Sequence, residues 1–345
     1  MGGQAAAFAG NMKSCEQWIE LYRRSTPYGD RDPDVVYLRA FVGYFGGGSA
    51  EVAIQHLKRM HAINPRVRPL ERDTLWYSAL MDRAGEHIVR GDYHLAIRDY
   101  REAARLSRMH RWEAKRQAAL GSAGISLRLA TRYAEAHEIF DALLKSNPES
   151  ALWHWHKGLV HAEEHEFQKA IASYRKVIAL RASGKATPST MANTEAVDLR
   201  LANCIRNITR PDLPRARREV LMAEAQKHLE IYVRRGPKDA NGHKWLGTFL
   251  YEDRERPLAA LPHFQRAYEL DPMCSAPLRY LVQIHTRHPP EQQEGESEAA
   301  YDKRALAWDK KRLALAKDLE DGVEKRAEEM ENRERKRGKN NTGCE

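Results

Sequence analysis

Small and aromatic residues recur along the chain at helical spacing. In four segments an alanine lies four residues before an aromatic side chain, so the two share one helical face. The pairs are Ala96 and Tyr100, Ala136 and Phe140, Ala170 and Tyr174, and Ala260 and Phe264. The small residue lets a neighbouring helix approach, and the ring fills the space beside it. The pattern therefore predicts closely packed helices.

Prolines divide these predicted helices from one another. Pro65, Pro148, Pro237 and Pro272 each follow a predicted helix, and Asn or Asp precedes three of them. Such residues are typical stop signals for a helix. Because the same helix and stop pattern returns several times, the sequence indicates an array of repeats.

The segment 117–149 resembles the tetratricopeptide-repeat family, whose unit is a helix-turn-helix of about 34 residues. The residues that match successive signature positions are Leu120, Gly124, Leu127, Tyr133, Ala136, Phe140 and Pro148. The next unit matches at Gly158, Phe167, Ala170 and Tyr174. A later one matches at Leu246, Gly247, Ala260, Phe264, Ala267 and Pro272.

The resemblance implies an all-α fold, a right-handed superhelical solenoid of about six helix-turn-helix units with a C-terminal capping helix. Two units depart from the pattern. The loop FGGGSAE loosens the first turn with three glycines, and an arginine-rich insertion, NITRPDLPRARRE, separates the two helices of the fifth unit. We interpret that insertion as a lengthened loop that could carry function.

Four regions are predicted. An N-terminal segment with a short helix (1–30) precedes the solenoid (31–288), an acidic linker (289–298) follows, and a capping helix with a charged tail (299–345) ends the chain. In the last region apolar residues recur at helical spacing, at Tyr301, Ala305, Trp308, Leu315 and Leu319. We expect this helix to fold back over the open end of the solenoid.

Composition supports an elongated fold in a reducing compartment. Of the 345 residues, 42% are hydrophobic and 30% charged, and the net charge is +9. The four cysteines are far apart and form no C-x-x-C pair, which argues against a zinc ribbon or a thioredoxin-like motif. No apolar run approaches the roughly 18 residues of a membrane span. We expect a cytoplasmic protein that is not inserted in a membrane.

The sequence contains no G-x-x-x-x-G-K-[ST], H-E-x-x-H or G-x-S-x-G motif, so we expect neither enzymatic activity nor a cofactor. His154, His156, His161 and His165 fall within twelve residues. We interpret them as packing residues, because His161 and His165 alone are too few ligands for a closed zinc site.

The family resemblance also implies a binding surface. In similar repeats the first helix of each unit lines a concave groove. The corresponding positions here are Arg128, Trp155, Asn203, Arg206, Lys244 and Tyr251. The clamp with which some relatives hold a terminal carboxylate is incomplete, since Thr248 replaces the Asn expected one turn after Lys244. We expect a protein scaffold or adaptor that binds an extended acidic peptide.

An alternative partner is nucleic acid. Arginines cluster in the insertion, at Arg210, Arg215, Arg217 and Arg218. A second group, Arg98, Arg101, Arg105 and Arg108, lines one side of a predicted helix, and we interpret it as a solvated outer face. The first group would suit an RNA- or ribonucleoprotein-associated factor. Oligomeric state does not follow from the sequence.

Overall fold

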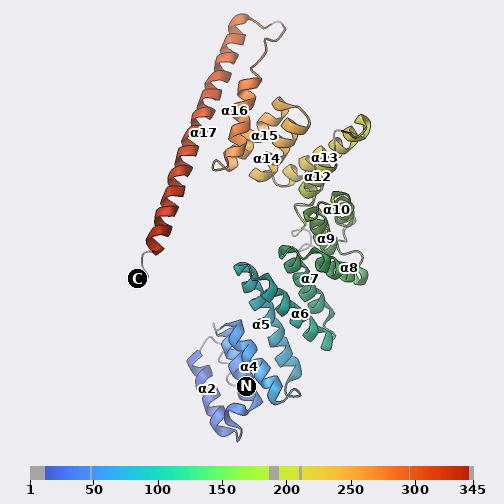
Figure 1. Ribbon diagram of the computed structural model, residues 1–345, viewed down its shortest axis with the longest axis vertical. Coiled ribbons are helices and arrows are strands. Elements are labelled where there is room, and N and C mark those ends of the chain that lie inside the picture. Colours follow the sequence, from blue (N-terminus) through green and yellow to red (C-terminus); the bar gives the residue numbers. More distant parts are fainter. Residues whose placement is uncertain (1–11, 47–48, 186–193, 210–211, 295, 342–345) are drawn as a thin grey trace. The chain divides into compact units, whose positions relative to one another are not determined.

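The protein is built from helices that follow one another in antiparallel pairs (Figure 1). A computed structural model describes residues 12–46, 49–185, 194–209, 212–294 and 296–341. These residues form helices and contain no strand. The all-α fold class predicted from the sequence is confirmed.

The chain divides into two compact units, which are described separately. The first comprises residues 1–166 and 180–187, and the second comprises 167–179 and 188–345. The helices of the first unit are α2 (Met12–Ser25), η1 (Gly29–Arg31), α3 (Pro33–Phe45), α4 (Ala50–Ile63), α5 (Pro69–Arg90), α6 (Tyr93–Met109), α7 (Glu113–Leu129), α8 (Tyr133–Ser146) and α9 (Ala151–Glu163). The boundary falls within α10 (Phe167–Ala182).

The second unit consists of further helices and one irregular turn. Its elements are α12 (Val197–Ile208), α13 (Arg215–Arg235), α14 (Ala240–Thr248), the π-helix η2 (Phe249–Asp253), α15 (Pro257–Leu270), α16 (Ser275–Arg287) and α17 (Glu298–Asn341). Each hydrogen bond of a π-helix spans one residue more than a hydrogen bond of an α-helix. Here the π-helix lies between α14 and α15.

The core follows the predicted small and large pairs. The four alanines of these pairs are fully buried, and so are the rings of Phe140, Tyr174 and Phe264. In the first unit a Cβ on Gly124 would lie 2.9 Å from the Phe140 ring, and in the second a Cβ on Gly247 would lie 2.9 Å from the Phe264 ring. Glycine is therefore required where each ring meets the preceding helix.

Buried ion pairs tie the helices of the first unit together. Arg83 on α5 donates through Nε and Nη2 to both carboxylate oxygens of Asp99 on α6, at 2.7 and 2.8 Å, and also contacts Glu51 on α4. Asp99 is fully buried. A bidentate pair satisfies both charged groups inside the protein, and it fixes the relative positions of α4, α5 and α6.

Both ends of the arginine-rich insertion are helical, so less of it is loop than the sequence indicated. Helix α12 ends at Ile208 and α13 begins at Arg215, so Arg215, Arg217 and Arg218 form the first turn of α13. Pro214 precedes that turn as its N-cap. Proline is tolerated just before a helix because its missing N–H is not needed for the helical hydrogen bonds.

The last helix packs against α16, as predicted for a capping helix. Trp308 on α17 donates from Nε1 to the carbonyl oxygen of His285 at 2.8 Å, and the two rings lie 4.0 Å apart. Leu315, about two helical turns after Trp308, is also buried. Within the part of the chain that the structure describes, no helix has the length and apolar character needed to cross a membrane.

Candidate binding surfaces

The two groove candidates of the first unit have partners within the chain. Arg128, near the end of α7, forms an ion pair with Glu163 at the end of α9. Trp155 on α9 is only 7% exposed. Its ring therefore belongs mainly to the packing of α9, and it can present only a small area to a bound segment.

The four groove candidates of the second unit come from three elements, and Arg206 and Tyr251 meet at the π-helix. Asn203 and Arg206 come from α12, Lys244 from α14 and Tyr251 from η2. The Arg206 guanidinium donates to Asp253 at 2.9 Å and to Glu252 at 2.6 Å. Lys244 donates to the Asn241 side chain at 2.9 Å. All four side chains are partly exposed.

The π-helix brings the partners of Arg206 and Tyr280 together. Tyr251, Glu252 and Asp253 are consecutive residues of η2, and the Arg254 amide donates to the Phe249 carbonyl across the widened turn at 3.1 Å. Glu252 also accepts from the Tyr280 hydroxyl on α16, and the Tyr251 ring meets the Tyr280 ring edge to face at 5.4 Å. We call Asn203, Arg206, Lys244, Tyr251, Glu252 and Tyr280 the π-turn surface.

Burial and the neighbouring charges act against each other at Asp253. Partial burial raises the pKa of this carboxyl, while the hydrogen bond and charge of Arg206 oppose that rise. Arg206 is thus engaged by two carboxylates, so an incoming carboxylate must compete for it. Among the groove candidates of this unit, Lys244 is the cation that has no carboxylate partner within the described residues.

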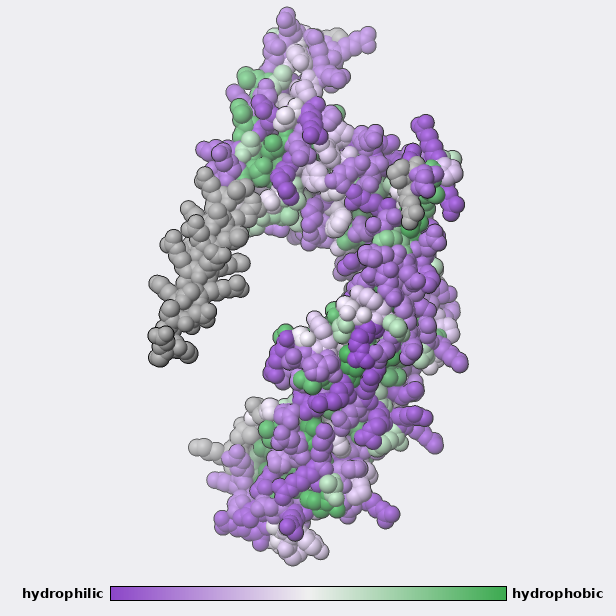
Figure 2. Space-filling model, in the orientation of Figure 1, coloured by the Kyte–Doolittle hydropathy of each residue, from purple (hydrophilic) through white to green (hydrophobic). Residues whose placement is uncertain are grey.

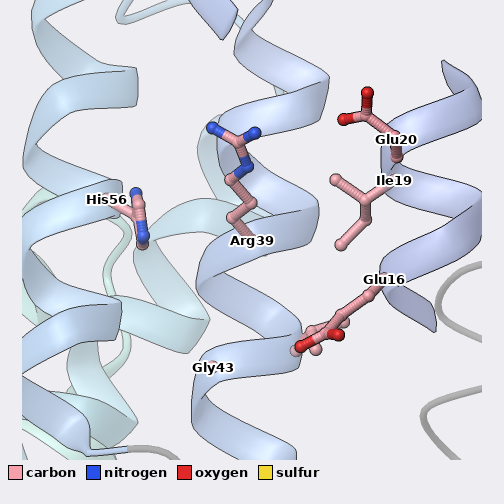
Figure 3. Close-up of a pocket in the computed structure, with 7 residues that line it drawn as sticks. Glu16, Ile19, Glu20, Arg39, Gly43 and His56 are labelled. Carbon is pink, nitrogen blue, oxygen red and sulfur yellow. The ribbon is translucent and has the colours of Figure 1, made fainter. Parts of the chain in front are cut away.

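A separate cleft of about 450 Å³ opens beside α2 in the first unit (Figure 3). Arg39 on α3 and His56 on α4 line one side, and residues of α2 line the other. Arg39 is held by Asp30 at 2.8 Å, and burial lowers the pKa of His56. The remaining lining residues are Glu16, Ile19, Glu20, Val42 and Gly43. The sequence did not reveal this cleft, because three helices contribute to it.

Three of the arginine candidates lie in the first turn of α13, the end of the helix where positive charge is unfavourable. Arg215 and Arg217 are exposed and Arg218 is half-buried, in the first turn of a 21-residue helix that carries no acidic residue there. The N-terminal end of a helix is positive, so it repels cations and attracts anions. Arg210 lies outside the described residues. The other predicted arginine group, Arg98 to Arg108, is exposed as expected, and Arg101 pairs with Glu135 at 2.9 Å.

A histidine and glutamate cluster lies between α8 and the end of α9. His137 on α8 is 2.6 Å from Glu164, and His161 on α9 is 2.7 Å from Glu166. The two imidazole rings are 4.4 Å apart. Burial lowers the pKa of His161, although its hydrogen bond to Glu166 acts in the opposite direction. Of these four residues, only His161 belongs to the closely spaced histidines of the sequence.

Comparison with known families identifies the repeat. A sequence profile described as tetratricopeptide repeat matches residues 122–185 and 222–273. These two segments match tetratricopeptide repeats. The first matched segment contains Gly124 and Phe140, and the second contains Gly247 and Phe264, so both cover the close helix contacts described above. This tetratricopeptide-repeat assignment agrees with the residues from which the resemblance was first drawn.

Solved structures with similar helix arrangements are distant in sequence. A tetratricopeptide repeat protein from Parabacteroides merdae is 13% identical, with a TM-score of 0.48, and the match covers 84% of this chain and 98% of that one. Yeast Tom70 is 14% identical, with a TM-score of 0.48 and coverage of 80% and 59%. YrrB, described as having an unusual peptide-binding site, is 16% identical, with a TM-score of 0.41 and coverage of 58% and 89%. A search of curated proteins gave no match.

Proposed function

We propose that this protein is a non-enzymatic scaffold or adaptor that binds an extended protein segment through the π-turn surface. The tetratricopeptide-repeat fold supports a protein partner, because stacked helix pairs present extended surfaces for binding. The carrying observation is the π-helix itself, which brings two tyrosines and three charged groups together at one irregular turn. π-Helical turns occur frequently at functional sites.

The chemistry of the surface suits a peptide. The Asn203 amide can donate to and accept from a peptide backbone, and the Tyr251 ring can provide an aromatic anchor. Hydrophilic residues cover most of the face seen in Figure 2, so a partner would be recognised through polar contacts around such an anchor. Lys244 supports a preference for an acidic segment, since no carboxylate of the described residues engages it.

Matched variants test this proposal. The full chain and the variants Tyr251→Ala and Lys244→Ala would be used to purify partners from cell extract, with and without nuclease, and peptides from a recovered partner would then be titrated. We expect Tyr251→Ala to weaken peptide binding about tenfold or more, as loss of an aromatic anchor does. Lys244→Ala should weaken acidic peptides selectively. Lys238→Ala, an exposed lysine at the turn after α13, is the control.

Either of two results would contradict the scaffold proposal. One is an unchanged affinity in both π-turn variants while circular dichroism shows native helix content. The other is the loss of all partners after nuclease treatment, which would indicate that nucleic acid carries the interaction.

The alternative is polyanion binding by the first turn of α13. Its supporting observation is that Arg215 and Arg217 stand exposed at the positive end of the helix, where a bound phosphate would relieve their repulsion. Binding of a labelled RNA should then fall steeply as salt rises, and the double variant Arg215→Ala, Arg217→Ala should reduce that salt dependence. A nuclease-resistant, salt-insensitive partner would favour the scaffold.

A further inference from the structure

The histidine and glutamate cluster of the first unit combines one residue of α8 with three residues from the end of α9 and the turn after it. His137 comes from α8, His161 from α9, and Glu164 and Glu166 from the turn after α9. One potential ligand atom from each residue lies within 4.8 Å of all the others. Within the described part of the chain, this is the group of histidines and carboxylates that converges in this way.

The turn after α9 explains why both glutamates face the histidines. His165 adopts a left-handed conformation with φ of 61°. The Glu166 amide donates to the His161 carbonyl at 2.8 Å, and the His165 amide donates to the Ala162 carbonyl at 3.2 Å. These two bonds form the usual closing motif of a helix, and they return the chain toward α8. Backbone geometry thus presets the positions of Glu164 and Glu166.

We propose that His137, His161, Glu164 and Glu166 form a binding site for a zinc ion. Two imidazole nitrogens and two carboxylate oxygens are ligands that zinc accepts in a tetrahedral arrangement. At metal–ligand distances of about 2.0 to 2.2 Å, tetrahedral ligands are roughly 3.4 Å apart. The observed His137–Glu164 and His161–Glu166 contacts are 2.6 and 2.7 Å, so each pair would open by less than about 1 Å to admit the ion.

Charge and accessibility agree with this assignment. Two ionised glutamates balance a divalent cation, and two neutral imidazoles complete the set. The exposed fractions of the four side chains range from 9% for His161 to 38% for Glu166, which leaves a path for the ion to enter. Four protein ligands leave no open position, so the site is structural: it would tie α8 to the end of α9.

Cobalt(II) is the probe for this site, because it accepts the same ligands and its visible spectrum reports tetrahedral geometry. Metal-free full-length protein would be titrated with cobalt(II) and then with zinc(II). We expect one cobalt ion per chain, intense visible absorption, and its loss as zinc displaces cobalt. Zinc should also raise the thermal unfolding midpoint, because it binds the native state.

Three variants decide the outcome. His137→Gln with His161→Gln should abolish the visible spectrum, and Glu164→Gln alone should weaken binding by about tenfold or more. His228→Gln is the matched control, since His228 also bonds a carboxylate, Asp198, at 2.7 Å, while no second histidine of the described residues converges on that pair. It should bind cobalt like the native chain.

Two results would overturn the site. The first is a native chain that shows no tetrahedral cobalt spectrum. The second is equal cobalt binding by the native chain and by Glu164→Gln. This substitution keeps the size and shape of the side chain, so it remains a test even if the double histidine variant does not fold. In that case the cluster would hold two hydrogen-bonded pairs without a metal ion, one between α8 and the turn after α9 and the other between α9 and that turn.

Discussion

Two helix groups of the protein share one packing scheme but differ by a single residue. In the first unit Phe140 follows Gly124 by sixteen positions, whereas in the second Phe264 follows Gly247 by seventeen. In both groups a Cβ on the glycine would nevertheless lie 2.9 Å from the ring. Both also stack on a ring sixteen positions later: Phe140 on His156 at 5.7 Å, and Phe264 on Tyr280 at 4.5 Å.

The extra residue lies in the π-helix. The left-handed turn residue is Thr131 in the first group and Glu255 in the second, seven and eight positions after the respective glycine. The insertion therefore falls between Gly247 and Glu255, where η2 replaces regular α-helix. A π-helical turn absorbs one added residue without moving the flanking contacts. The close contacts of the core are therefore kept although the second group carries one residue more.

The largest expected effect tests the shared packing. Gly124→Ala and Gly247→Ala should each destabilise the protein by about 2 to 3 kcal/mol, because the added methyl group overpacks against a buried ring. Alanine would ordinarily stabilise a helix relative to glycine. Gly85→Ala on α5 is the control, since a Cβ there meets nothing within 4 Å, and it should stabilise by up to about 1 kcal/mol. Chemical unfolding followed by circular dichroism measures all three.

The next effect concerns His156, which stacks on Phe140 as Tyr280 stacks on Phe264. Burial, aided by the Arg128 charge, lowers the pKa of His156 to about 4, and its Nδ1 has no hydrogen-bond partner among the described residues. The unfolded chain, with a pKa near 6.5, therefore takes up the proton first as pH falls. Stability from this group is fully present above pH 6.5 and is lost between pH 6.5 and 4.

The expected loss between pH 7 and pH 5 is about 2 kcal/mol. This loss should be absent in His156→Phe. The variant then resembles the second group, because the ring that stacks on Phe140 no longer titrates in this pH range. Unfolding of both proteins at the two pH values isolates the contribution of His156 from those of other histidines. Equal pH dependence in the native chain and the variant would show that His156 accepts a proton in the folded state.

The repeated core could be predicted from the sequence, and the candidate sites could be predicted only in part. Ala136 and Phe140 are four residues apart on one helix, so their shared face follows from local geometry. The contact between His137 and Glu164 depends instead on how α8 meets the turn after α9. Trp155 occupied a groove position by register, yet its large ring is mostly covered. Spacing identifies a helical face, but neighbouring helices decide how much of a side chain remains accessible.

The smallest expected effect concerns the turn residues of the two groups. Thr131 and Glu255 both have positive φ, at 58° and 52°, a conformation that disfavours side chains and especially β-branched ones. Gly91 holds the corresponding place between α5 and α6 with φ of 81°. We expect Thr131→Gly to stabilise by about 1 kcal/mol and Glu255→Gly by about half as much. Gly91→Thr should destabilise by a similar amount, and a stabilising Gly91→Thr in the same unfolding assay would contradict the turn equivalence.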